Sequence, residues 1–228
     1  MTNTPNDAPS TMEPVERLQG NILARIERRL LNWLCARLPS FVTPDKMTAL
    51  GFLGAILIGA GYVLSGYDRN WLWLSVAAYF INWFGDSLDG SLARFRKIER
   101  PDYGYFLDHS VDSLAIIFIV GGIGLSPYIE FEIATIPLLG YLLLAIHTFL
   151  SAKVLGEFQL AHAGAGPTEL RIMLIVLTIT MWALGPVPVG FGNFTIFDAF
   201  TFVIGSILFL LFITSTWRTA MRLRAKYH

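Results

Sequence analysis

The sequence predicts an all-α integral membrane protein: a bundle of six transmembrane helices preceded by an amphipathic interfacial helix. Two observations support this fold class. The 228-residue chain is 54% hydrophobic and only 15% charged, which leaves too little polar surface for a water-soluble domain of this size. Its apolar residues also gather into six stretches that are each long enough to cross the hydrocarbon core, which takes about 20 residues.

The chain opens with a polar segment and a short amphipathic one. Residues 1–16 contain three prolines and no apolar run, which predicts a disordered tail. Residues 17–38 carry arginines between apolar positions that recur every four residues: Leu18, Ile22, Ile26, Leu30 and Leu34. This pattern predicts a juxtamembrane helix on the bilayer surface, with its arginines among anionic headgroups. The alternative is a soluble helix docked on another part of the protein.

The six spans follow within residues 39–217, and no change of composition divides them into separate domains. We place them at residues 46–66, 71–92, 105–126, 133–155, 168–187 and 196–217. Residues 218–228 form a basic cytoplasmic tail. Of the 17 Lys and Arg residues, 16 fall on one side of this arrangement and only Arg69 on the other. The positive-inside rule therefore predicts that both termini are cytoplasmic. The zero formal net charge would argue against a general nucleic-acid binder if the charges were evenly spread. They are concentrated on one side of the arrangement, so their distribution matters more than their sum, and we expect no nucleic-acid partner.

Carboxylates cluster where the second span ends and the third begins. In a helix, Asp86 and Asp89 share one face, and Asp108, His109 and Asp112 share another. The connection between these spans is about ten residues long, so we expect antiparallel neighbours whose acidic faces meet near the cytoplasmic surface. Four carboxylates in one small volume require a counterion. Oxygen ligands of this kind favour Mg²⁺ or Mn²⁺ (or Ca²⁺), and Mg²⁺ commonly completes its shell with substrate phosphates.

Eight positions in this region form a spaced pattern. They are Asp86, Asp89, Gly90, Ala93 and Arg94, followed after nine residues by Gly104, Asp108 and Asp112. The pattern resembles the signature of the CDP-alcohol phosphotransferase (CDP-alcohol phosphatidyltransferase) family. The six spans and the preceding surface helix are also similar to that family, so the resemblance extends over most of the chain.

The resemblance implies a metal-dependent transferase of phospholipid synthesis, in which a CDP-linked donor passes a substituted phosphoryl group to an alcohol and CMP is released. By this resemblance Asp86, Asp89, Asp108 and Asp112 hold Mg²⁺ or Mn²⁺ as a pair of ions. The general base is Asp112 or His109. The nucleotide site takes Gly90, Ala93 and Gly104, with Arg94 in that site or in its supporting network. The resemblance also implies a homodimer, and small residues such as Ala55 and Gly59 could support close helix contact.

Two further segments open spans on the cytoplasmic side. The stretch from Thr43 to Thr48 resembles the Thr-Pro-Asn-x-x-Thr element of the family, with Asp45 where Asn is usual. We expect Thr43 to cap the helix, Pro44 to occupy its first turn, and Thr48 to contact the nucleotide. At the start of span five, Arg171 either pairs with Glu169, a neighbouring Asp or a substrate phosphate, or is a helix-start residue that snorkels to the interface.

Two versions of the reaction are open, and they differ in whether the CDP carries the lipid or the polar headgroup. In one, CDP-diacylglycerol gives its phosphatidyl group to a small polar alcohol such as glycerol phosphate, inositol phosphate or serine. The short chain resembles bacterial CDP-diacylglycerol enzymes, which favours this version, an inner-membrane location and a cytoplasmic active site. In the other, a CDP-linked headgroup passes to a lipid alcohol, because Asp108 and His109 resemble the Asp-His pair of choline and ethanolamine phosphotransferases. A divalent cation transporter and an inactive scaffold are the rival classes.

Overall fold

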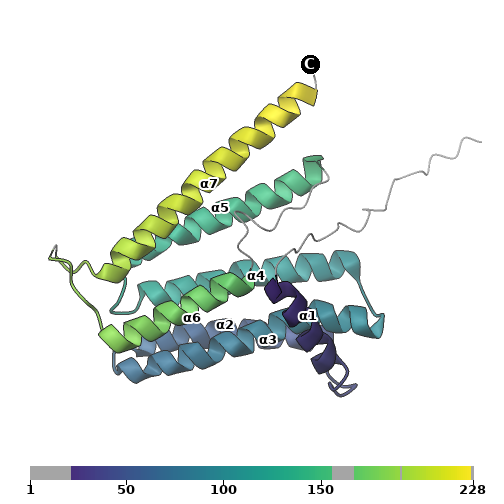
Figure 1. Ribbon diagram of the computed structural model, residues 1–228, viewed down its shortest axis with the longest axis horizontal. Coiled ribbons are helices and arrows are strands. Elements are labelled where there is room, and N and C mark those ends of the chain that lie inside the picture. Colours follow the sequence, from purple (N-terminus) through teal and green to yellow (C-terminus); the bar gives the residue numbers. More distant parts are fainter. Residues whose placement is uncertain (1–21, 156–166, 191, 227–228) are drawn as a thin grey trace, which may run out of the picture.

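The computed structural model describes residues 22–155, 167–190 and 192–226, and these residues form seven α-helices and one short 3₁₀ helix (Figure 1). In chain order they are α1 (Ile22–Cys35), α2 (Pro44–Leu64), η1 (Arg69–Trp71), α3 (Leu72–Arg96), α4 (Pro101–Gly124), α5 (Phe131–Leu155), α6 (Pro167–Leu184) and α7 (Ile196–Lys226). The all-α prediction is confirmed for this part of the chain. The predicted tail, and the predicted surface helix before residue 22, lie outside the described residues.

Local signals in the sequence set several helix ends. Thr43 is the N-cap of α2, where its side chain accepts a hydrogen bond from the Lys46 backbone N–H at 3.4 Å, and Pro44 occupies the first turn. Both roles are as predicted. Helix α3 ends at Lys97, which adopts the left-handed conformation with φ of 55°. This is the usual backbone conformation after a helix, although Gly is the usual residue for it.

Among the described residues, five helices are long and apolar enough to cross a membrane: α2, α4, α5, α6 and α7. Helix α3 corresponds to the second predicted span and has 25 residues, but it is not among the five. Its second half carries Asp86, Asp89, Arg94 and Arg96, which lower its mean hydropathy. At 1.5 Å per residue, 25 helical residues still exceed the roughly 30 Å of a hydrocarbon core. Helix α7 runs past the predicted span to Lys226.

Helices α2, α3 and α4 form the centre of the bundle, with α6 against α3 (Figure 1). Helices α5 and α7 run side by side at an angle to this group, and α5 also contacts α4. Glycines bring α2 and α3 into close contact, because a Cβ added at Gly85 would lie 2.2 Å from the Gly51 backbone nitrogen. This approach fixes where the acidic half of α3 lies relative to α2.

The small residues Ala55 and Gly59 of α2 lie in close contacts within the chain. Ala55 is fully buried within the chain. A Cβ added at Gly59 would lie 2.4 Å from the Phe118 carbonyl oxygen, so Gly59 packs against α4. The predicted close helix contact at these small residues is confirmed, and it is made between α2 and other helices of the same chain.

Helix α1 docks on α3 through one apolar edge. Leu31 and Cys35 are buried in a cluster with Met47, Leu88 and Leu92. Leu30 from the predicted apolar stripe instead remains 43% exposed, and Arg28 and Arg29 are exposed as well. Helix α1 therefore contacts the bundle with one face and leaves a basic and apolar face free of the described chain.

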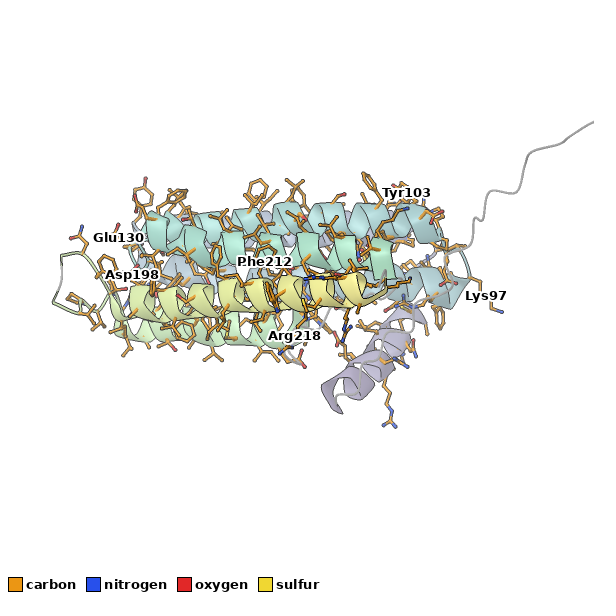
Figure 2. The ribbon with its side chains drawn as sticks, turned by 90° about the horizontal axis from the view of Figure 1, so that it is seen from above. Lys97, Tyr103, Glu130, Asp198, Phe212 and Arg218 are labelled. Atoms are coloured by element: carbon orange, nitrogen blue, oxygen red, sulfur yellow. The ribbon has the colours of Figure 1, made fainter. Side chains whose placement is uncertain are left out.

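The two ends of the bundle differ in charge and in structure (Figure 2). Lys97 and Tyr103 lie at one end, and Glu130 and Asp198 lie at the opposite end (Figure 2). At the second end, the fully buried Asp198 carboxylate accepts hydrogen bonds from the backbone N–H groups of Glu130 and Thr195, each at 2.7 Å. These bonds fasten the loop after α4 to the start of α7.

Candidate functional site

A small pocket between α2, α3 and α4 collects the carboxylates that the sequence singled out. Its lining residues are Thr48, Gly51, Phe52, Asn82, Asp86, Asp89, Asp108, Val111, Asp112 and Ala115. All four predicted aspartate ligands are among them. They occupy the second half of α3 and the first half of α4, which lie toward the Lys97 and Tyr103 end (Figure 2). The short α3–α4 connection therefore brings the two acidic faces together, as the helical spacing predicts.

Asp89 is oriented from two sides. One carboxylate oxygen accepts a hydrogen bond from the Thr48 hydroxyl at 2.8 Å, and the other accepts one from the Gly90 backbone N–H at 2.5 Å. Thr48 lies on α2, so the close packing of α2 and α3 is what allows the first bond. The sequence predicted a nucleotide contact for Thr48, and the structure shows it hydrogen-bonded to Asp89.

Asp86 is paired with a cation from α6. The Arg171 guanidinium lies 2.6 Å from an Asp86 carboxylate oxygen and donates a second bond, of 2.9 Å, to the Asn82 side-chain carbonyl. Asn82 in turn donates to the Gly51 backbone carbonyl at 2.9 Å. The side chains of Arg171 and Asp86 are only 15% and 21% exposed. This pair therefore lies inside the bundle, where opposite charges interact more strongly than in water.

Asp108, His109 and Asp112 form a second part of the acidic group. One ligand atom from each lies within 4.8 Å of the others, so the three residues could hold a metal ion. His109 Nδ1 lies 3.9 Å from an Asp108 carboxylate oxygen. The imidazole packs edge-on against Tyr105, with ring centroids 4.4 Å apart, and lies 5.2 Å from the Phe149 ring of α5. These aromatic contacts hold the ring in place beside the pocket.

The remaining predicted residues do not line this pocket. Gly90, Ala93, Arg94 and Gly104 are absent from its lining. Arg94 is exposed and donates to the Ser91 hydroxyl at 3.4 Å, and a Cβ added at Gly90 would lie 3.2 Å from its guanidinium. Gly104 is exposed, with open space where a Cβ would be. Gly90, Ala93 and Arg94 follow Asp89 toward the end of α3, so they lie farther along the helix than the acidic pocket.

The donor set fits a hard divalent cation. The pocket offers four carboxylates, the Thr48 hydroxyl and the Asn82 amide, and His109 adjoins it. Oxygen donors of this kind suit Mg²⁺ and Mn²⁺ better than zinc or copper. Arg171 supplies one positive charge against four carboxylates. The arrangement therefore has an excess of negative charge that a metal ion would neutralise.

Two basic residues that the sequence counted only as loop charges organise the entrance to α2. Arg96 donates to the backbone carbonyls of Leu38, Pro39 and Val42 at 3.0, 2.9 and 2.5 Å, which fixes the connection between α1 and α2. Arg100 forms an ion pair with Asp45. Asp45, where the family usually has Asn, thus has a partner within the protein. No spacing rule in the sequence could identify either partner, because each contact spans more than 50 residues.

The fold and the pocket together define a helical membrane protein with an oxygen-rich acidic pocket toward one end of its apolar helices, of a kind that could hold a divalent cation. The sequence pattern of the CDP-alcohol phosphatidyltransferase family matches residues 41–221, which is most of the chain. The protein belongs to this family. It is therefore a transferase of substituted phosphate groups, as the spaced aspartates predicted.

Two curated relatives are similar to the chain. An archaetidylinositol phosphate synthase of Pyrococcus horikoshii is 26% identical over 172 residues, which cover 75% of this chain and 79% of that protein. A phosphatidylinositol phosphate synthase of Cutibacterium acnes is 36% identical over 91 residues, which cover 40% of this chain and 41% of that protein.

Proposed function

We propose that this enzyme transfers a phosphatidyl-type group from a CDP-diacylglycerol-type donor to the hydroxyl of a small phosphorylated alcohol, with release of CMP. The observation that carries this proposal is the convergence of four aspartates from α3 and α4 in one pocket of a family member. Both curated relatives bear the names of inositol phosphate lipid synthases. Those names favour an inositol phosphate acceptor and a lipid-bearing CDP donor.

Asp86, Asp89, Asp108 and Asp112 would hold a pair of Mg²⁺ or Mn²⁺ ions in this proposal. Such ions, when bound, neutralise charge on the diphosphate and on the departing CMP. The chain's own residues prepare that site. Thr48 orients Asp89, Asn82 orients Arg171, and Arg171 holds Asp86. Arg171 also presents a guanidinium beside the pocket, where it suits a substrate phosphate.

Asp112 is our candidate for the general base. The acceptor oxygen attacks the phosphorus that carries the lipid, the bond from that phosphorus to CMP breaks, and the acceptor proton passes to a carboxylate. Asp112 lines the pocket, whereas His109 only adjoins it and packs against aromatic rings. His109 is the alternative base. A positioned base typically adds about 10² to 10⁴ in rate, so D112N and H109A should separate the two roles by the size of the kcat loss.

The choline or ethanolamine version of the reaction rests on the Asp108 and His109 pair. In the structure this pair is separated by 3.9 Å. Neither relative's name points to that chemistry. We therefore place CDP-diacylglycerol first and a CDP-linked headgroup second.

The proposed topology has six spans with both termini in the cytoplasm. Helix α3 is the sixth span in this proposal; its length and its packing along the candidate span α2 support that assignment. The pocket then opens toward the cytoplasmic face of an inner membrane, since Lys97 marks the basic end and Glu130 the acidic one (Figure 2). A homodimer, as the family resemblance implies, would use a surface other than the buried Ala55 and Gly59 faces.

The test is an assay of CMP release by the purified protein in mixed micelles of CDP-diacylglycerol. Inositol phosphate, glycerol phosphate and serine are offered in turn, with Mg²⁺, Mn²⁺ or a chelator, and the lipid product is identified by mass spectrometry. We expect a phosphatidylinositol phosphate product only with a divalent ion. D89N should lower kcat at least a hundredfold at unchanged folding, because it removes a ligand charge. D102N, at an exposed aspartate in the first turn of α4, is the matched control. Product formation with CDP-choline and diacylglycerol, but not with CDP-diacylglycerol, would contradict the proposal.

A further inference from the structure

Glu27 of α1 contacts two other helices of the bundle beside the acidic pocket. Its half-buried carboxylate accepts hydrogen bonds from the Trp83 indole N–H at 2.8 Å and from the Ser87 hydroxyl at 3.4 Å, both on α3. It also accepts from the Thr168 hydroxyl, which lies 3.1 and 3.3 Å from its two oxygens. Thr168 is the second residue of α6. The surface helix therefore reaches the beginning of the helix that carries Arg171.

Helix α6 has few apolar contacts to fix its first turns. Its two fully buried residues, Thr178 and Met181, both lie in its second half. Thr178 is tied to the Tyr62 hydroxyl at 2.5 Å, so that half is well held. Leu174 and Ile175, in the middle of α6, also pack against the apolar core. Among the described residues, 167–173 are not part of that core, and their polar contacts include Thr168 with Glu27, and Arg171 with Asp86 and Asn82.

Thr168 and Arg171 are three residues apart, so they share one face of α6. A shift of the first turn of α6 moves both side chains together. Arg171 has bonds of 2.6 and 2.9 Å to Asp86 and Asn82, and bonds of this length are lost when the donor moves by about an ångström. The position of Thr168 therefore controls whether Arg171 stays on Asp86.

We infer that Glu27 is a positioning residue for the transferase reaction: through Thr168 it holds the first turn of α6 so that Arg171 stays in the acidic pocket. The function of this contact rests on the proposed function, because its effect is read in that reaction. Helix α1 is then part of the catalytic unit as well as a surface helix. Glu27 touches no reacting atom and acts only through α6.

The first test measures hydrogen exchange of the full-length protein by mass spectrometry and needs no turnover. E27A should raise exchange in a peptide covering residues 167–175. T168V should do the same, because it removes the hydroxyl donor. E27Q should stay near wild type, because its amide oxygen can still accept from Trp83 and Thr168. Glu99 is exposed in the α3–α4 connection, and E99A is the control expected to match wild type. Wild-type exchange in E27A would overturn the inference.

The second test measures KM and kcat for donor and acceptor in E27A, R171K and the double variant. R171K keeps the charge but changes the bidentate geometry, so it identifies the substrate that Arg171 helps to bind. E27A should raise the KM for that same substrate about tenfold, in line with loss of a charge-assisted hydrogen bond. Because Glu27 acts through Arg171, the double variant should match R171K within about twofold.

Three outcomes would count against this role. If the effects of E27A and R171K on KM multiply in the double variant, Glu27 acts by a route other than Arg171. A lower kcat at unchanged KM, together with a lower thermal midpoint, would show that Glu27 only supports folding. E27Q should keep the wild-type KM. If its KM is raised as in E27A, the hydrogen bonds that Glu27 accepts are not what positions Arg171. If the wild-type protein releases no CMP, the proposed function fails, but the exchange measurement still decides the α1–α6 contact.

Discussion

Gly85→Ala should push α2 and α3 apart and thereby displace the aspartates of α3 in the acidic pocket. The added Cβ would lie 2.2 Å from the Gly51 nitrogen, 2.5 Å from the Gly51 Cα and 2.6 Å from the Met47 carbonyl oxygen, all backbone atoms. Ordinary van der Waals contact begins at 3.4 Å, so the helices must part by about 1 Å. Gly85 precedes Asp86, and the Thr48–Asp89 bond of 2.8 Å crosses the same interface.

Overpacking of this kind costs about 1 to 3 kcal/mol of folding free energy. A misplacement of about 1 Å in a catalytic group lowers the rate by about 10²-fold. The assays are thermal unfolding in detergent and CMP release with CDP-diacylglycerol and Mg²⁺. The matched control is Gly121→Ala, a helical glycine of α4 with no atom within 4 Å of an added Cβ, which should be neutral or slightly stabilising. A G85A protein as stable and as active as G121A would refute the packing argument.

Three further measurements test features that do not line the pocket. Lys97→Gly should stabilise the protein by about 1 kcal/mol in thermal unfolding, because Lys97 has a φ of 55° that glycine adopts without strain; a lower midpoint would contradict this. Asp198→Ala should cost about 2 to 4 kcal/mol, because it leaves the Glu130 and Thr195 N–H groups without a buried acceptor, and activity per folded molecule should be unchanged at the opposite end of the bundle. Cys35 is 2% exposed and burial raises the pKa of its thiol, so maleimide should label it slowly in the native protein and rapidly in SDS; rapid native labelling would contradict the docking of α1.

The helices and the identity of the acidic group could be predicted from the sequence because both depend on short-range spacing. An apolar run of sufficient length must satisfy its backbone hydrogen bonds internally in a bilayer, so it forms a helix without reference to its neighbours. Asp86 and Asp89, like Asp108 and Asp112, share a helical face at fixed intervals. Because the connection between α3 and α4 is short, the two helices are antiparallel neighbours and their acidic faces meet. Helix α3 is not among the five helices that length and hydropathy mark as candidate spans, and its two aspartates lower its hydropathy.

The contacts that orient the pocket side chains join residues that are far apart in the sequence, so they could not be predicted from it. Arg171 lies 85 residues from Asp86, and Thr168 lies 141 residues from Glu27. The sequence left Arg171 with several candidate partners and offered no role for Glu27. It named Gly59 as a residue for close helix contact, but only the structure shows that the contacting helix is α4.

The sequence by itself determined that this chain is helical and which aspartates share a pocket, because helical periodicity and chain connectivity act locally. Its spaced pattern also identified the transferase family, by resemblance. Only the tertiary structure decided how α1, α2 and α6 surround those aspartates. The choice among partners for a given side chain depends on how closely the helices approach. That approach is set by packing at glycines such as Gly51 and Gly85, whose contacts become visible only when the helices are assembled.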